Sequence, residues 1–211
     1  MNLSIETIAN GPWKQNCYVV ADLDTRKSFI VDPGSESAKI QKRIDDGGFE
    51  PVAIVNTHGH FDHVGAVDFL MKTYGIPFYL SSDDAQLLKQ ANIYRLLFET
   101  KEAITVPKVT NPLDPQNHRL SVGPFDISVI LTPGHTKGSV CLIVEGEIFS
   151  GDTIFSKQIG RTDLPGGDSG ALRESVNILR QLPGSLNVWP GHGRPFLLEN
   201  LWEILDVESD A

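Results

Sequence analysis

The chain has 211 residues, of which 40% are hydrophobic and 21% charged, with a formal net charge of −9 and a pI of about 5.1. This size and composition indicate one globular domain with a substantial core. The acidic balance argues against nucleic acid or an anionic membrane as a partner, because phosphate recognition depends on Lys and Arg. The sequence has neither a signal-peptide pattern nor a membrane-length apolar run, so we expect a cytoplasmic protein.

Short apolar runs bounded by turn residues predict the strands. In chain order they cover residues 3–8, 17–21, 28–31, 52–55, 78–80, 127–131, 139–144, 147–149 and 187–189. Apolar residues at helical spacing predict the helices, which lie around Ile40 and Ile44, over 64–74, 82–98 and 171–181, and near 198–207. Residues 105–124 are rich in Pro and Asn and are expected to form a long loop.

The order of these elements predicts the fold class. Strands come in groups ahead of helices, which argues against a doubly wound parallel sheet. An α+β fold, in which two mixed β-sheets pack as a sandwich with helices outside, fits better. We find no linker or low-complexity segment, so residues 1–211 are predicted to be a single domain. Cys17 and Cys141 lie in apolar strand-like runs and are expected to be buried free thiols.

Three histidines and one aspartate are concentrated in the segment HGHFDH, residues 58–63, directly after the apolar run VAIVN. Histidines at positions i and i+2 of an extended segment point the same way. Asp62 and His63 then begin a helix and can face a second point nearby. The segment therefore offers two ligands to each of two metal ions.

Three more residues of the same chemical type follow other strand-like runs. They are His135 in LTPGHTKGS, Asp152 in FSGDTIF and His192 in VWPGHGRP. Loops at one edge of a packed sheet can converge on a single site, so we predict that four strand ends carry metal ligands to one place. His118 lies in the polar segment DPQNHRL and is expected to be exposed or hydrogen-bonded instead.

HGHFDH, together with the later PGHT, GDT and GHG, resembles the metallo-β-lactamase superfamily over nearly the whole chain. The resemblance implies an αββα sandwich and a two-metal site. The implied ligands are His58, His60 and His135 for the first metal, Asp62, His63 and His192 for the second, and Asp152 as the bridge. Asp32 in VDPG matches a recurrent family motif and is interpreted as support for a ligand histidine; an Asx turn before Pro33 is the alternative.

Imidazole and carboxylate ligands suit Zn, Fe or Mn, so we predict two divalent metal ions per chain, with Zn as the first choice. Two metals that share a carboxylate also share a water, whose pKa then falls far enough for hydroxide to exist at neutral pH. Hydrolysis needs no protein nucleophile under these conditions. Asp62 and Asp152 are therefore the predicted catalytic residues.

The stretch IFSGDTIFSKQIGRTDLPGGD looks like the glyoxalase II-like group of the superfamily, which hydrolyses glutathione thioesters. The similarity implies that Arg161 binds a substrate carboxylate, a bidentate task that suits guanidinium, with a structural salt bridge as the alternative. Longer enzymes of the group carry a C-terminal helical domain with further glutathione contacts. The chain ends soon after GHG, so we expect no such domain. True β-lactamases usually carry a secretory signal, and we expect a different activity here.

We therefore predict a thioesterase of the glyoxalase II type. It would cleave S-(2-hydroxyacyl)glutathione, such as S-lactoylglutathione, to glutathione and the 2-hydroxy acid by a metal-bridging hydroxide. Two alternatives stay open: a persulfide dioxygenase with mononuclear iron, because GRTD also resembles that group, and a non-catalytic or redox metal-binding module. The expected partner is the small-molecule thioester, and the protein is expected to be a monomer or a small homo-oligomer.

Overall fold

Over residues 1–98, 102–114 and 118–209, which the computed structural model describes, the strands form two six-stranded sheets. The strands of the first sheet lie side by side in chain order: β1 (Leu3–Asn10), β2 (Gln15–Asp22), β3 (Lys27–Val31), β4 (Glu50–Val55), β5 (Phe78–Ser81) and β6 (Asn111–Leu113). In the second sheet, too, each strand lies beside the next one along the chain, from β7 at one edge to β12 at the other. Its strands are β7 (Arg119–Val122), β8 (Phe125–Leu131), β9 (Val140–Val144), β10 (Glu147–Gly151), β11 (Asn187–Pro190) and β12 (Phe196–Leu197).

Both sheets are mixed, as predicted. In the first sheet β1, β2 and β3 pair antiparallel, and β3 to β6 run parallel. In the second sheet β10 and β11 pair parallel, and the other neighbours pair antiparallel. All of β2 is buried, as expected for a strand that is covered on both faces.

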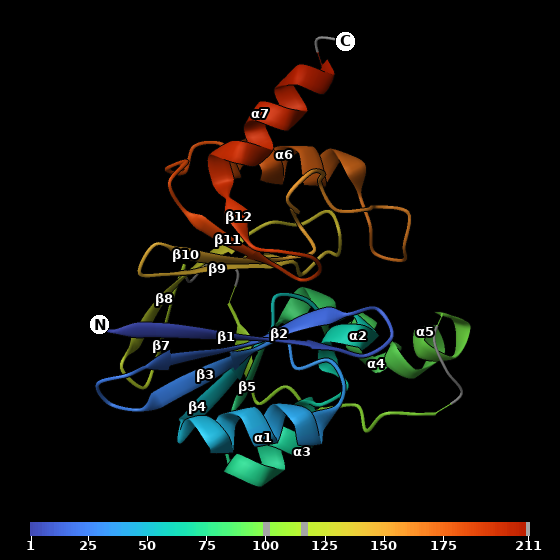
Figure 1. Cartoon of the computed structure of the whole chain (residues 1–211). Helices are drawn as coiled ribbons and strands as arrows, with labels where there is room; N and C mark the ends of the chain where they lie inside the picture. Colours follow the sequence, from blue (N-terminus) through green and yellow to red (C-terminus); the bar gives the residue numbers. More distant parts are fainter. Residues whose placement is uncertain (99–101, 115–117, 210–211) are drawn as a thin grey trace.

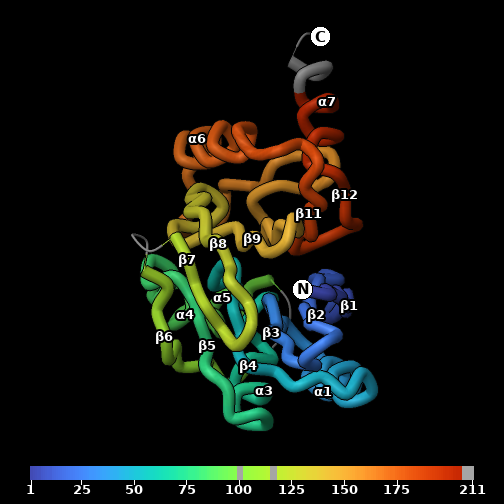
Figure 2. The backbone as a smooth tube through the Cα atoms, turned by 90° about the vertical axis from the view of Figure 1, so that its left-hand side faces the viewer, coloured from blue at the N-terminus to red at the C-terminus, as the bar shows by residue number. Residues whose placement is uncertain are grey.

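The two sheets pack face to face and helices cover the outer face of each (Figures 1 and 2). The first sheet carries α1 (Ser37–Gly47) and α3 (Val67–Tyr74), and the second carries α6 (Ser169–Leu179) and α7 (Leu198–Ser209). Between the sheets lies a core rich in aromatic and β-branched residues, in which the rings of Phe29 and Phe125 meet edge to face at 4.9 Å. The αββα sandwich that the sequence predicts is therefore confirmed.

The predicted long loop over residues 105–124 is wrong in part, because it contains β6 and β7. β6 is an edge strand, and Pro112 is tolerated there because an edge strand has one side with no ladder to donate to. β7 pairs antiparallel with β8 through the turn at Gly123, whose φ of 55° is a left-handed conformation that glycine adopts freely. Residues 115–117 of this segment lie outside the described residues.

Two predicted helices are each divided. The helix expected over 64–74 is α2 (Phe61–Val64) followed by α3. The helix expected over 82–98 is a 3₁₀ turn at Ser82–Asp84, then α4 (Ala85–Lys89) and α5 (Ala91–Phe98). Figure 1 shows α2, α4 and α5 together at one end of the sandwich, so these breaks turn the chain around the end of the sheets.

Cys17 and Cys141 are both buried and free, as expected. Within the described ranges, none of the helices combines the length and the apolar composition needed to cross a bilayer.

Candidate metal centre

HGHFDH connects the end of β4 to α2, at one edge of the first sheet. His58 and His60 lie in the connection, and His60 has the extended backbone of a residue that precedes a helix. Asp62 and His63 occupy the helix itself, as the sequence predicts. The three histidines are buried and Asp62 is half-buried. The side-chain amide of Asn56 donates to the main-chain oxygen of His63 at 2.8 Å and so holds the turn closed.

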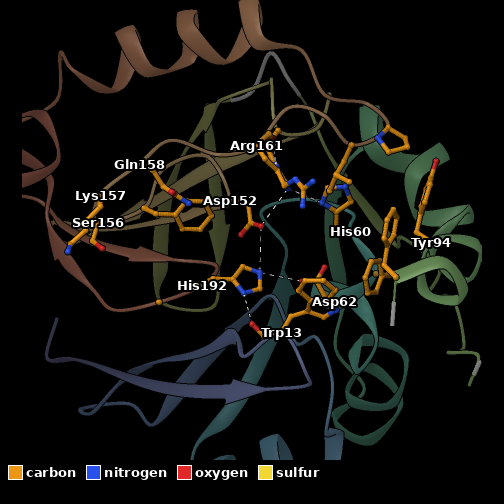
Figure 3. A pocket seen from close by; sticks show the side chains of 17 residues that line it. Trp13, His60, Asp62, Tyr94, Asp152, Ser156, Lys157, Gln158, Arg161 and His192 are labelled. Atoms are coloured by element: carbon orange, nitrogen blue, oxygen red, sulfur yellow. Dashed lines mark hydrogen bonds and ion pairs between the residues drawn. The ribbon is translucent and has the colours of Figure 1, made fainter. Parts of the chain in front are cut away.

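The other three residues come from the second sheet. His135 lies between β8 and β9, Asp152 directly follows β10, and His192 follows β11 after Gly191. Figure 3 shows Asp152 and His192 pointing into the same space as His60 and Asp62. The structure thus brings the ends of four strands, from two sheets, to one place.

The first group consists of His58, His60 and His135. Nδ1 of His60 lies 2.9 Å from Nε2 of His135, and the ring of His58 stands 4.9 Å from that of His60 and 5.0 Å from that of His135. One nitrogen from each ring can be chosen so that all three lie within 4.8 Å of one another. This spacing suits three nitrogen ligands around one ion.

The second group consists of Asp62, His63 and His192. Oδ2 of Asp62 lies 3.3 Å from Nε2 of His192 and 3.8 Å from Nε2 of His63. Asp152 lies between the two groups, since its Oδ2 is 3.6 Å from Nε2 of His135 and also 3.6 Å from Nε2 of His192. A carboxylate in this position can bridge two cations.

Three of the atoms that face this space are buried and lack a hydrogen-bond partner within the described part of the chain. They are Nε2 of His58, Nε2 of His63 and Oδ1 of Asp152. A buried polar atom without a partner is costly, and a bound cation would satisfy all three. The donor set of imidazole nitrogens and carboxylate oxygens suits Zn, Fe or Mn. The residues present therefore fit divalent metal ions.

One carboxylate orients a histidine of each group. Oδ2 of Asp32 accepts hydrogen bonds from Nδ1 of His63 at 2.9 Å and from the Thr57 hydroxyl at 2.6 Å. The Thr57 oxygen lies 3.1 Å from Nδ1 of His58 and accepts from it in turn. Asp32 is buried and has a φ of 49°, a conformation that is uncommon outside glycine. Asp32 could itself count as a ligand beside His58 and His63 by distance alone, but its Oδ2 accepts from these two donors and its Oδ1 accepts from the Thr57 N–H at 2.7 Å.

Main-chain carbonyls orient two more histidines. The oxygens of Arg161 and Trp13 lie 2.9 and 3.0 Å from Nδ1 of His135 and His192, respectively. A carbonyl oxygen can only accept, so each Nδ1 carries the proton and each Nε2 is left as a lone pair. Four of the five histidines are thereby fixed with Nε2 facing the site.

Burial and the surrounding charges separate the pKa values of the histidines. Burial, together with His135, lowers the pKa of His60 to about 3, and burial together with His63 lowers the pKa of His58 well below its ordinary value. Burial acts in the same direction on His63, but Asp62 and the other carboxylates outweigh it and raise the pKa of His63 to about 9. His58 and His60 are therefore neutral at pH 7, whereas a cation in the second group must displace a proton from His63.

Asp84 is a residue of the site that the sequence analysis missed. Its Oδ2 accepts from the N–H of Gly59, inside HGHFDH, and from the Thr136 hydroxyl, both at 2.8 Å. Its Oδ1 accepts from the N–H of Gly138, also at 2.8 Å. The buried carboxylate thus ties the connection that carries two histidines of the first group to the connection that carries His135.

Gly191, directly before His192, has a steric role. A Cβ at this position would collide with Oδ1 of Asp152 and would lie 2.8 Å from Cε1 of His63. Only glycine allows these two side chains to approach the main chain of β11 so closely. His118, in contrast, is exposed directly before β7 and belongs to neither group.

A cavity of about 460 Å³ opens beside the histidines. Besides the cluster, the residues that line it include Trp13, Tyr94, Phe98, Phe155, Lys157 and Arg161. The Arg161 guanidinium makes a bidentate pair with Asp163, with Nε and the terminal nitrogen each 2.7 Å from a carboxylate oxygen. This pairing lowers the pKa of Asp163 to about 2. Arg161 thus lies where the sequence predicts a substrate contact, but with an acidic neighbour already bound.

A family model for the metallo-beta-lactamase superfamily matches residues 10–192. The Bacillus subtilis (strain 168) protein named "Probable metallo-hydrolase YqgX" is 37% identical over 186 residues, with 87% of each chain covered. The structure of the BLEG-1 B3 metallo-beta-lactamase has 35% identity and a TM-score of 0.88, over 95% of this chain and 97% of that one. The structure of TTHA1623 in a di-iron-bound form has 34% identity and a TM-score of 0.80, over 92% and 96%.

Proposed function

The chain belongs to the metallo-β-lactamase superfamily and is a metal-dependent hydrolase, and we propose that it is a thioesterase of the glyoxalase II type. The proposed substrate is an S-(2-hydroxyacyl)glutathione, and the products are glutathione and the 2-hydroxy acid. The observation that supports the proposal most is the complete set of seven inward-facing ligand atoms beside a cavity with Arg161 at its wall.

In this proposal His58, His60 and His135 would hold a first divalent ion, Asp62, His63 and His192 would hold a second, and Asp152 would serve as a ligand to both. The two cations, when bound, would supply a nucleophilic water at neutral pH and a Lewis acid for the thioester carbonyl. The chain itself orients the ligands through Asp32 and the carbonyls of Trp13 and Arg161. The cavity of about 460 Å³ beside these ligands gives the thioester room to reach them.

We expect fully loaded protein to contain two metal ions per chain. The reason is that both groups are complete and are joined by Asp152. Metal analysis by plasma mass spectrometry, on protein dialysed against excess Zn²⁺, Fe²⁺ or Mn²⁺ in turn, measures the stoichiometry. A maximum of one ion per chain under all three conditions would refute the two-metal site, whereas a low content as purified would reflect weak retention.

Arg161→Ala is expected to raise KM for S-lactoylglutathione about tenfold to a hundredfold, with a smaller change in kcat, because one charge-assisted hydrogen-bonded contact contributes about 1.5–3 kcal/mol. The main-chain oxygen of Arg161, which holds His135, is kept in this variant. Since Asp163 competes for the same guanidinium, Asp163→Asn should lower KM for the same substrate.

The matched control is S-lactoyl-N-acetylcysteamine, which has the same acyl group and no carboxylate. Its KM should change little in either variant. If Arg161→Ala impaired both thioesters equally, Arg161 would be a structural residue and the glutathione assignment would lose its support outside the cluster.

The activity itself is tested on one metal-loaded sample with three substrates. Release of free thiol from S-lactoylglutathione is the expected result. Oxygen uptake with glutathione persulfide, and no thioester cleavage, would replace the proposal by the dioxygenase alternative. β-Lactam hydrolysis is a second candidate, favoured by the similarity to the BLEG-1 enzyme, and ring opening of a chromogenic cephalosporin tests it.

A further inference from the structure

Three aromatic side chains form a wall beside the metal centre, which we call the aromatic wall: Trp13, Tyr94 and Phe98. They come from two separate segments, which are the β1–β2 turn and α5. Trp13 is 49% exposed and Phe98 is 47% exposed, although both are large and apolar. Aromatic rings that stay exposed around one concave space are typical of a ligand site.

A main-chain contact connects the aromatic wall to a histidine of the metal centre. The carbonyl of Trp13 lies 3.0 Å from Nδ1 of His192. The turn that carries Trp13 is fixed at its other end by the N–H of Lys14, which donates to the Gly11 oxygen at 3.2 Å. A group packed on this wall would therefore lie close to the centre, in a fixed position.

The cavity is polar on a different side. Figure 3 shows Tyr94 at one side of the cavity and Lys157 and Gln158 at the other, with Asp152 and His192 between them. A ligand that spans the centre would thus meet an apolar surface at one end and cationic and amide groups at the other. A thioester with an apolar acyl group and a charged thiol has this division, whereas a lactoyl group offers one methyl to the wall.

We propose that the aromatic wall is the acyl-binding site and that it selects thioesters with an aromatic acyl group. This inference rests on the proposed function and names its substrate class. In the reaction, the oxygen of water bonds to the carbonyl carbon and the C–S bond breaks. The thiol leaves with one proton, and the carboxylic acid releases the other.

Binding is tested without turnover by two thioethers, S-benzylglutathione and S-methylglutathione, on the metal-loaded protein by calorimetry. The benzyl compound should bind at least about tenfold more tightly, since apolar pockets discriminate to this extent between groups of different size. Trp13→Ala and Phe98→Ala should each reduce the ratio of the two affinities toward one. Ile178→Ala is the matched control, because Ile178 is 49% exposed on α6 and lies outside the cavity.

Turnover is tested with S-mandeloylglutathione and S-lactoylglutathione, which differ only by phenyl in place of methyl. The mandeloyl substrate should have the higher kcat/KM, and Trp13→Ala should remove the difference. Equal affinity for the two thioethers would overturn the inference, as would a benzyl preference that both wall variants retain. Equal turnover of the two thioesters, combined with equal thioether affinity, would overturn the inference and leave the proposed function standing. A benzyl preference that is lost in the wall variants, without cleavage of any thioester, would support the wall and refute the proposed function.

Discussion

Asp152→Ala is expected to lower kcat/KM by at least about a thousandfold, which corresponds to roughly 4 kcal/mol of transition-state stabilisation. The carboxylate stands 3.6 Å from a nitrogen of the first group and 3.6 Å from a nitrogen of the second. Its removal takes a ligand from each group. It also removes the negative charge that stabilises two neighbouring cations. His60→Ala should have a comparable effect, because Nδ1 of His60 faces Nε2 of His135 within the first group.

Steady-state thioester hydrolysis, with the metal content measured on the same sample, gives the result. His118→Ala is the control, since this histidine is exposed on another part of the fold and should leave activity close to that of the wild type. Circular dichroism separates loss of metal from loss of fold. Comparable losses in the His118 and Asp152 variants would show that the division of the six histidines is wrong.

Asp84→Asn is expected to weaken metal binding by the first group about tenfold to a hundredfold, the range typical of residues that orient a ligand. An amide cannot accept from all three donors that the carboxylate serves, because its NH₂ would face one of them. Gly59 and Gly138 would then shift, and with them the connections that carry His58, His60 and His135. The second group should change less, because its residues make no hydrogen bond to Asp84 in the described structure.

Competition with a chromogenic chelator resolves the two binding steps. Asp83→Asn is the matched control, since this neighbour is exposed and has the same charge. A buried donor that loses its partner in the Asp84 variant also lowers the free energy of unfolding by about 1–3 kcal/mol. Thermal unfolding of the metal-free protein should therefore be measured alongside the titration. Equal weakening of both steps would indicate a general destabilisation, and an unchanged first step would refute the positioning role of Asp84.

The sequence predicted the sandwich and the cluster because both depend on local patterns. An apolar run predicts a buried strand whichever strand it pairs with. HGHFDH holds four of the seven cluster residues within six positions, so its pattern is visible in a short stretch of sequence. β6 and β7 were missed because their sequences are short and polar or contain proline, and pairing at the sheet edges decides their conformation. Asp84 was missed for a related reason. Its partners Gly59 and Gly138 lie 25 and 54 residues away and contribute only main-chain N–H groups, which leave no mark on the sequence.

For Arg161, the motif predicted a role but not the neighbouring side chain that binds it. The similarity implied that Arg161 binds a substrate carboxylate, but did not indicate that Arg161 lines this cavity with its guanidinium already paired to Asp163. Trp13 could not be recognised at all, because its contact with His192 joins residues at opposite ends of the chain.

The division of the ligands between the two sheets sets the order of events during folding. Neither sheet holds a complete group, since HGHFDH follows β4 of the first sheet and His135 and His192 follow strands of the second. A cation therefore has no full binding site until both layers have formed and docked. In small zinc domains the ion itself drives folding. Here we expect the core around Phe29, Phe125 and Phe149 to form first, and the ion to bind late, between layers already in contact.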